Sequence, residues 1–169
     1  QSVSRVGGKA QRAAYRSVAG DLKLAYAQFE ELETFARFGA RLDEDTRQSI
    51  EHGKRIRACL GQAEFSPVSV PAQIAILLAL NAALFDPVPL ERMSAAQQAV
   101  EDATQDLPDD LSARLTAGDK LTDADRQQVT EAARAALESF LPQTDNPHDK
   151  AAATTQTAEK PHENPDQQR

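Results

Sequence analysis

The residues with the clearest chemical potential stand at the start of the chain, in the run Ser2-Val3-Ser4-Arg5-Val6-Gly7-Gly8, directly before a long amphipathic segment. Glycines let backbone N–H groups approach a ligand closely, and a helix start offers unpaired donors and partial positive charge. The guanidinium of Arg5 adds a planar fork of donors that matches phosphate oxygens. This pattern indicates a candidate phosphate site, while Gly-Gly before a helix is also typical of a plain turn.

Complete catalytic signatures are absent from the sequence. The run Gly7-Gly8-Lys9-Ala10 lacks the spaced first glycine and the Ser or Thr after lysine with which a P-loop holds phosphate and magnesium. Neither Gly-x-Ser-x-Gly nor His-Glu-x-x-His is present. We therefore expect the chain to be inactive as an enzyme on its own.

Metal ligands are few and scattered. Cys59 is the one cysteine, which excludes an internal disulfide and favours a buried thiol that packs like a small apolar side chain. His52 stands alone on an expected helix, whereas His148 and His162 fall in a polar tail. We expect no metal site.

The elements that must position these residues are helices almost throughout. Between 8 and 38, apolar side chains recur at alternating steps of four and three residues, which predicts one long amphipathic helix. They are Val18, Leu22, Ala25, Phe29, Leu32 and Ala36. The almost wholly apolar run from Ile74 to Leu80 predicts a buried core helix over 71–85. Further helices are predicted over 44–60 with Asp43 as cap, 89–106, 108–115 ending before Gly118, and 122–141 capped by Thr122.

These elements predict an all-α protein, an antiparallel helical bundle over 9–142. No strand is expected, apart from residues 2–6, whose pattern suits the end of a strand in a preceding domain. The chain starts at Gln1 instead of Met, so we expect a piece of a longer protein. Residues 143–169 contain no Leu, Ile, Val, Phe, Met or Tyr, and we expect a disordered tail there, because it cannot bury enough apolar area to offset its ordering entropy.

Charge is distributed unevenly over the 169 residues, whose net charge is −7. Residues 1–38 carry six Lys and Arg against four Asp and Glu, whereas 86–141 carry five against twelve. An acidic second half does not suit a nucleic-acid groove, which needs clustered basic residues. No apolar run approaches the ~20 residues that cross a bilayer, so we expect any link to a membrane to come through partners.

The order of motifs resembles the C-terminal part of the alpha subunit of F-type ATP synthases. The resemblance rests on the opening run through Gln11, on Val18-Ala19-Gly20-Asp21-Leu22-Lys23-Leu24, and on Ala27-Gln28-Phe29-Glu30-Glu31-Leu32. It continues through Phe35-Ala36-Arg37-Phe38-Gly39 and the turn Gln62-Ala63-Glu64-Phe65-Ser66-Pro67, and fades after about Asp86. The resemblance is specific over the first half of the chain. Over the second half only the helical architecture is similar.

The resemblance implies a role for the opening run. In F-type synthases three alpha and three beta subunits alternate around a rotating shaft, the gamma subunit, and alpha binds ATP or ADP with Mg²⁺ without turning it over. Each alpha lends an arginine to the catalytic site of its beta neighbour, and Arg5 matches that arginine, with Ser2 and Ser4 as the adjoining serines. Residues 1–8 are then the remnant of a nucleotide-binding domain, and the complex lies peripherally at the cytoplasmic face of the bacterial plasma membrane.

Two departures from the family pattern concern the sites. Gln62 matches a glutamine that lies against the base of the nucleotide bound by alpha, but Glu64 replaces the second glutamine of that turn. A carboxylate accepts but does not donate at neutral pH, which puts this base contact in doubt. Arg41 replaces an acid in the loop that faces the rotor. These changes suggest a divergent branch, such as the alternative or sodium-translocating synthases.

Two other interpretations stay open. A stand-alone acidic helical protein-interaction module would explain the composition equally well, but not the order of the matching motifs. A degenerate alpha-like remnant with no assembly role cannot be separated from a working subunit by this sequence.

Overall fold

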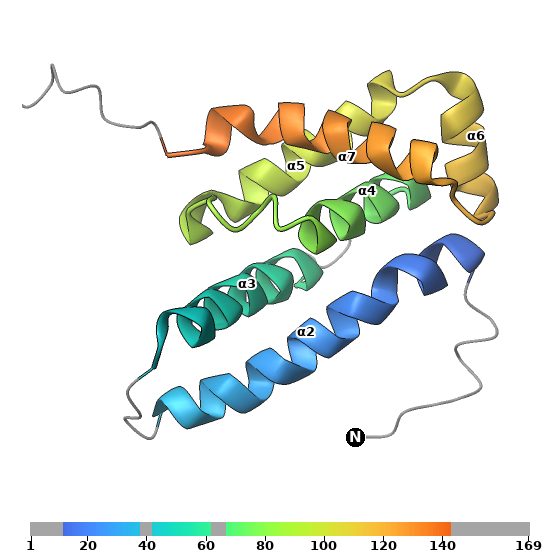
Figure 1. Cartoon of the computed structure of the whole chain (residues 1–169). Helices are drawn as coiled ribbons and strands as arrows, with labels where there is room; N and C mark the ends of the chain where they lie inside the picture. The colour runs from blue at the N-terminus through green and yellow to red at the C-terminus, as the bar shows by residue number, and fades with distance from the viewer. Residues whose placement is uncertain (1–11, 38–41, 62–66, 143–169) are drawn as a thin grey trace, which may run out of the picture.

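The computed structural model describes residues 12–37, 42–61 and 67–142, and within these ranges every regular element is a helix (Figure 1). The α-helices are α2 (Ala13–Arg37), α3 (Glu44–Leu60), α4 (Val70–Asn81), α5 (Met93–Ala103), α6 (Asp109–Ala117) and α7 (Asp123–Leu137). Short 3-10 turns flank α5 and extend α7: η1 (Leu90–Arg92), η2 (Thr104–Asp106) and η3 (Glu138–Phe140). The prediction of an all-α antiparallel bundle is confirmed. The expected tail and the expected strand end lie outside the described residues.

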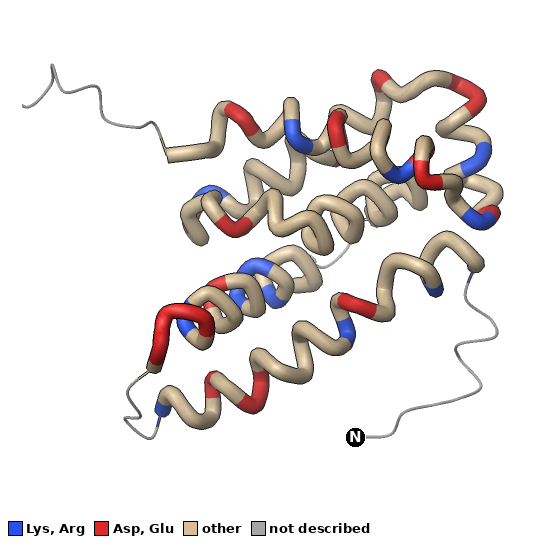
Figure 2. Tube along the Cα trace, viewed as in Figure 1, with Lys and Arg blue, Asp and Glu red and all other residues tan. Residues whose placement is uncertain are grey.

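Helix α4 forms the centre of the bundle. It packs against each of the other α-helices named above. The α2–α3 hairpin covers one side of it, and α5, α6 and α7 lie on the other side (Figure 1). Lys, Arg, Asp and Glu are distributed over the surrounding helices, whereas α4 carries none of them (Figure 2).

The sequence of α4 explains this position. The Ser69 hydroxyl accepts a hydrogen bond from the backbone N–H of Ala72 at 3.3 Å and caps the helix, and Pro71 suits its first turn. Ile74, Leu78 and Leu80 are at most 5% exposed. Burying each such side chain contributes about 1.5–3 kcal/mol. The predicted buried core helix is confirmed.

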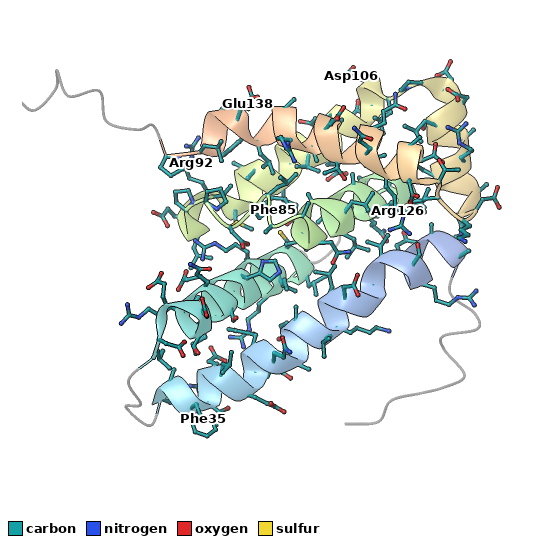
Figure 3. All side chains as sticks on the ribbon, viewed as in Figure 1. Phe35, Phe85, Arg92, Asp106, Arg126 and Glu138 are labelled. Atoms are coloured by element: carbon teal, nitrogen blue, oxygen red, sulfur yellow. The ribbon has the colours of Figure 1, made fainter. Side chains whose placement is uncertain are left out.

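The end of α4 differs from the prediction, because the helix stops at Asn81 and not at residue 85. Ala83 has a φ of +54°, in the left-handed region that favours glycine. The N–H of Leu84 then returns to the carbonyl of Ala79 at 3.0 Å, which reverses the chain. This reversal buries Phe85 completely (Figure 3), and that burial offsets the ~1–2 kcal/mol that a left-handed alanine costs.

Helix α2 turns its predicted apolar stripe toward the bundle. Val18, Leu22 and Phe29 are at most 5% exposed, and the other members of the stripe are half-buried. At Phe29 the two helices of the hairpin meet closely, since a Cβ added to Gly53 of α3 would overlap the Phe29 side chain. Glycine is therefore required at this crossing.

Local capping sets the start of α3, the end of α6 and the start of α7. Asp43 accepts from the backbone N–H of Thr46 at 2.8 Å and starts α3 where the sequence predicts. Gly118 ends α6 with a φ of +73°. Thr122 and Asp125 form a reciprocal capping box at the start of α7. The predicted roles of Asp43, Gly118 and Thr122 are confirmed.

The Asp125 carboxylate supports a prediction about acid stability. It is 5% exposed and accepts from the Arg114 guanidinium at 2.7 Å and from the Thr122 N–H at 3.0 Å. The hydrogen bond from Arg114 has the largest effect, and together with the bond from Thr122 it holds the pKa of Asp125 below its usual range. We expect Asp125→Asn to lower the free energy of unfolding by about 1 kcal/mol or more at pH 7.

Urea unfolding at several pH values checks this expectation. A lowered carboxyl pKa contributes stability above the unfolded value of ~3.9, and that contribution is lost as pH falls through the folded value. The difference between wild type and Asp125→Asn should therefore shrink from pH 7 toward pH 3. Asp110→Asn is the control, because Asp110 pairs with the same Arg114 but its side chain is 73% exposed. An equal loss in both variants would contradict the assignment.

Candidate functional site

The residues predicted to act on phosphate and nucleotide lie outside the described part of the chain. They are Ser2, Ser4, Arg5, Gln62 and Glu64, and Arg41 lies outside it as well. Their roles stay predictions. The structure does describe the segments that flank them, which are the start of α2 and the two sides of the α3–α4 connection.

The start of α2 is anchored on the corner between α6 and α7. The Arg12 guanidinium donates to the carbonyl of Thr116, and the N–H of Ala14 donates to the carbonyl of Gly118 at 3.3 Å. The Arg12 side chain also covers Gly118 so closely that a Cβ there would overlap it. Whatever precedes α2 in the chain is thus attached to a fixed point of the bundle.

A chain of hydrogen bonds links the start of α2 to the far side of the α3–α4 connection. The Tyr15 hydroxyl donates to Oε1 of Gln73 at 2.7 Å, and Nε2 of Gln73 donates to the carbonyl of Val68 at 2.7 Å. A tyrosine hydroxyl is protonated at neutral pH and can donate, and burial raises the pKa of Tyr15 further. The structure therefore brings together the flanks of the two predicted site regions. Sequence analysis missed Tyr15 and Gln73, because residues 58 positions apart leave no local pattern.

A cavity of about 210 Å³ lies beside the same connection. Its lining comes from the end of α3, the connection before α4, α4 itself and one side chain of α5: Cys59, Leu60, Val68, Gln73, Ile76, Leu77 and Gln97. Its walls are mainly apolar, and the amides of Gln73 and Gln97 supply polar edges. Ligand pockets usually measure about 300–1,000 Å³, so this cavity is smaller than a typical ligand pocket.

Cys59 has the character that the sequence predicts. It is 3% exposed, and burial raises the pKa of its thiol to about 12. Such a thiol stays protonated and unreactive at neutral pH. Among the described residues, no three His, Cys, Asp or Glu side chains gather closely enough to hold a metal ion. In the same part of the chain, no helix combines the length and apolarity needed to span a bilayer.

Comparison with known families identifies the family of this bundle. The family described as "ATP synthase alpha/beta chain, C terminal domain" matches residues 11–136. The chain belongs to this family. The match covers every helix from α2 to the greater part of α7, so the bundle described above is this C-terminal domain.

Three curated relatives of this chain are ATP synthase alpha subunits. ATP synthase subunit alpha 2 of Albidiferax ferrireducens is 63% identical over 161 residues, which are 95% of this chain and 30% of the relative. Subunit alpha 2 of Polaromonas naphthalenivorans is 66% identical over 142 residues, 84% of this chain and 27% of the relative. Subunit alpha 1 of a Marinomonas species is 64% identical over 145 residues, which are 86% of this chain and 28% of the relative. The chain thus spans less than a third of these relatives' length.

Proposed function

We propose that the chain serves as the C-terminal part of the non-catalytic alpha subunit of an ion-translocating rotary F-type ATP synthase. The observation that carries the proposal is the 63% identity over 161 residues to an ATP synthase subunit alpha. In this role the complete subunit binds ATP or ADP with Mg²⁺ and alternates with beta subunits around the gamma rotor. The complex lies at the cytoplasmic face of the bacterial plasma membrane and couples ATP synthesis to the transport of protons or sodium ions.

Arg5 is the residue that links this subunit to catalysis in our proposal. It extends into the catalytic site of the neighbouring beta subunit, flanked by Ser2 and Ser4, and neutralises oxygens of the phosphoryl group in transit. The anchoring of Arg12 and Ala14 on the α6–α7 corner supports this role. An arginine that must cross an interface needs a fixed base, because small displacements of a catalytic group cost much of its effect.

The free end of the α2–α3 hairpin is the part that we assign to the rotor contact. This end lies far from α6, at the opposite end of the molecule from the start of α2 (Figure 1). Phe35 is 67% exposed near it, and points away from the bundle (Figure 3). Asp43 and Glu44 are exposed on the other arm of the hairpin. An exposed aromatic side chain with charged neighbours is suited to a subunit contact, where aromatic residues are enriched.

The turn with Gln62 and Glu64 yields a prediction about nucleotide binding to alpha. In the complete subunit, Glu64→Gln should strengthen binding of adenine nucleotide several-fold, because the amide regains a donor beside the base. Titration calorimetry of both forms with ATP and Mg²⁺ checks this. Gln98→Glu, which changes an exposed amide of α5 in the opposite sense, is the control and should leave the affinity unchanged. Equal affinities of wild type and Glu64→Gln would show that residue 64 does not contact the base.

Reconstitution tests the proposed function as a whole. A complete alpha subunit that carries this sequence should form a ring when it is co-expressed with beta and gamma subunits and purified by size exclusion. A stand-alone interaction module or a remnant without assembly role would leave beta and gamma without it. Recovery of this chain apart from beta and gamma would therefore overturn the proposal.

A further inference from the structure

The sequence suggests that His52 stands alone, but in the structure His52 has a partner 34 positions away. Its Nδ1 atom lies 2.7 Å from Oδ1 of Asp86. The side chains are 21% and 35% exposed, so the pair is mostly shielded from water. His52 belongs to the middle of α3, and Asp86 belongs to the turn that follows α4. The pair thus joins the α2–α3 hairpin to the opposite part of the bundle.

A second contact joins the same two segments. The Arg55 guanidinium, one turn further along α3, donates to the carbonyl of Val88 at 3.2 Å. Arg55 is 9% exposed and also pairs with Glu51 of its own helix. Arginine side chains do not lose their charge in proteins, so a contact of this kind does not depend on pH. The contact between His52 and Asp86 is the one that can change.

Among the residues that line the cavity beside His52, Asp86 is the one other ionisable group. The pair lines a cavity of about 260 Å³, to which α2 contributes Ala25 and Gln28, and α3 contributes Gln48 and Ser49. None of these four side chains titrates. On α3 itself, Lys54 and Arg55 each pair with Glu51. Among the residues that the structure describes around this cavity, Asp86 is therefore the ionic partner of the imidazole.

We propose that His52 and Asp86 form a pH-dependent clasp that fixes the α2–α3 hairpin to the rest of the bundle. Histidine changes its charge between pH 5 and 8, whereas aspartate carboxylates are ionised throughout that range. Above the transition the pair is a hydrogen bond from a neutral ring. Below it the pair is a charge-assisted bond, which is roughly twice as strong. The clasp tightens as pH falls and loosens as pH rises, and the stability that it adds follows the same direction.

A double-mutant cycle tests the clasp directly. Wild type, His52→Gln, Asp86→Asn and the double variant of the 169-residue chain are unfolded in urea at pH 5.5 and at pH 8.5. The coupling, expressed as a ratio of folding constants, should be at least about three-fold larger at pH 5.5 than at pH 8.5. The same coupling at both pH values would overturn the proposal.

Two further measurements separate the clasp from general effects of acid. Gln98 donates to Asp102 at 3.0 Å on α5, and a cycle of Gln98→Ala with Asp102→Ala should give the same coupling at both pH values, because glutamine does not titrate. If Asp86→Asn fails to fold, the comparison uses a chain with His148→Gln and His162→Gln, so that His52 is its one histidine. Its stability should fall between pH 5.5 and 8.5 relative to the same chain with His52→Gln. Parallel pH profiles of these two chains would refute the clasp.

Discussion

Leu78→Asp should abolish cooperative folding of the helical domain. Leu78 is 5% exposed on α4, the helix that every other α-helix of the described bundle contacts. An aspartate there would place a carboxylate without a partner among apolar side chains, and the cost of several kcal/mol is comparable to the whole stability of such a domain. Thermal unfolding followed by circular dichroism should show a broad transition or none.

The matched control is Leu24→Asp, which makes the same substitution on a leucine that is 62% exposed on α2. It should leave the cooperativity of unfolding unchanged. The milder Leu78→Ala should fold but lose about 2–5 kcal/mol, as buried leucine truncations do. Full cooperativity in Leu78→Asp would mean that α4 is not the centre of the core. The contrast between the two leucines isolates burial from the chemistry of the substitution.

The parts of the fold that the sequence predicts well are those that local interactions determine. The bounds of α3 follow from a capping aspartate at 43 and an unbroken helical pattern to 60, and the structure has the same bounds. Gly118 and Thr122 end and start their helices through contacts within a few residues. The apolar run at 74–80 leaves α4 without a polar face, so its burial follows from composition alone.

The parts that the sequence does not predict depend on contacts between distant residues. Helix α4 stops at Asn81 although the pattern continues to 85, because the chain reverses at Ala83 and buries Phe85. His52 finds Asp86 only once α3 lies against the turn after α4. No periodicity or spacing marks these side chains before the helices are packed.

The candidate site shows the same division. Residue types alone leave the opening run open between a phosphate site and a turn, and the resemblance to alpha subunits favours the phosphate site, which stays a prediction. The family match begins at residue 11 and so does not include this run. The hydrogen bonds through Tyr15 and Gln73, which link the flanks of both predicted site regions, are found only in the folded molecule. The sequence predicts which residue types could act at the site, whereas the packing of the helices determines how the segments that flank those residues lie relative to one another.

Arg5→Ala, in a complete alpha subunit assembled with beta and gamma, should lower multi-site ATP turnover by at least ~10²-fold while nucleotide still binds. An arginine finger acts mainly on charge that develops during phosphoryl transfer, so its loss lowers the rate more than the affinity. Steady-state hydrolysis and nucleotide titration of the purified ring measure the two effects separately. Arg134→Ala, which removes an exposed arginine of α7, is the control and should retain turnover.

Arg5→Lys distinguishes a finger from a simple positive charge. An ammonium is a single compact charge without the planar fork of a guanidinium, so lysine should not restore the rate. If Arg5→Lys restored turnover, Arg5 would act only through its positive charge. If Arg5→Ala preserved turnover, Arg5 would only anchor the loop. The 169-residue chain itself lacks a P-loop and should show no hydrolysis with either residue at position 5. Hydrolysis by the purified chain would contradict the whole assignment, because an arginine that acts across an interface has no reaction to assist until the neighbouring subunit supplies the nucleotide site.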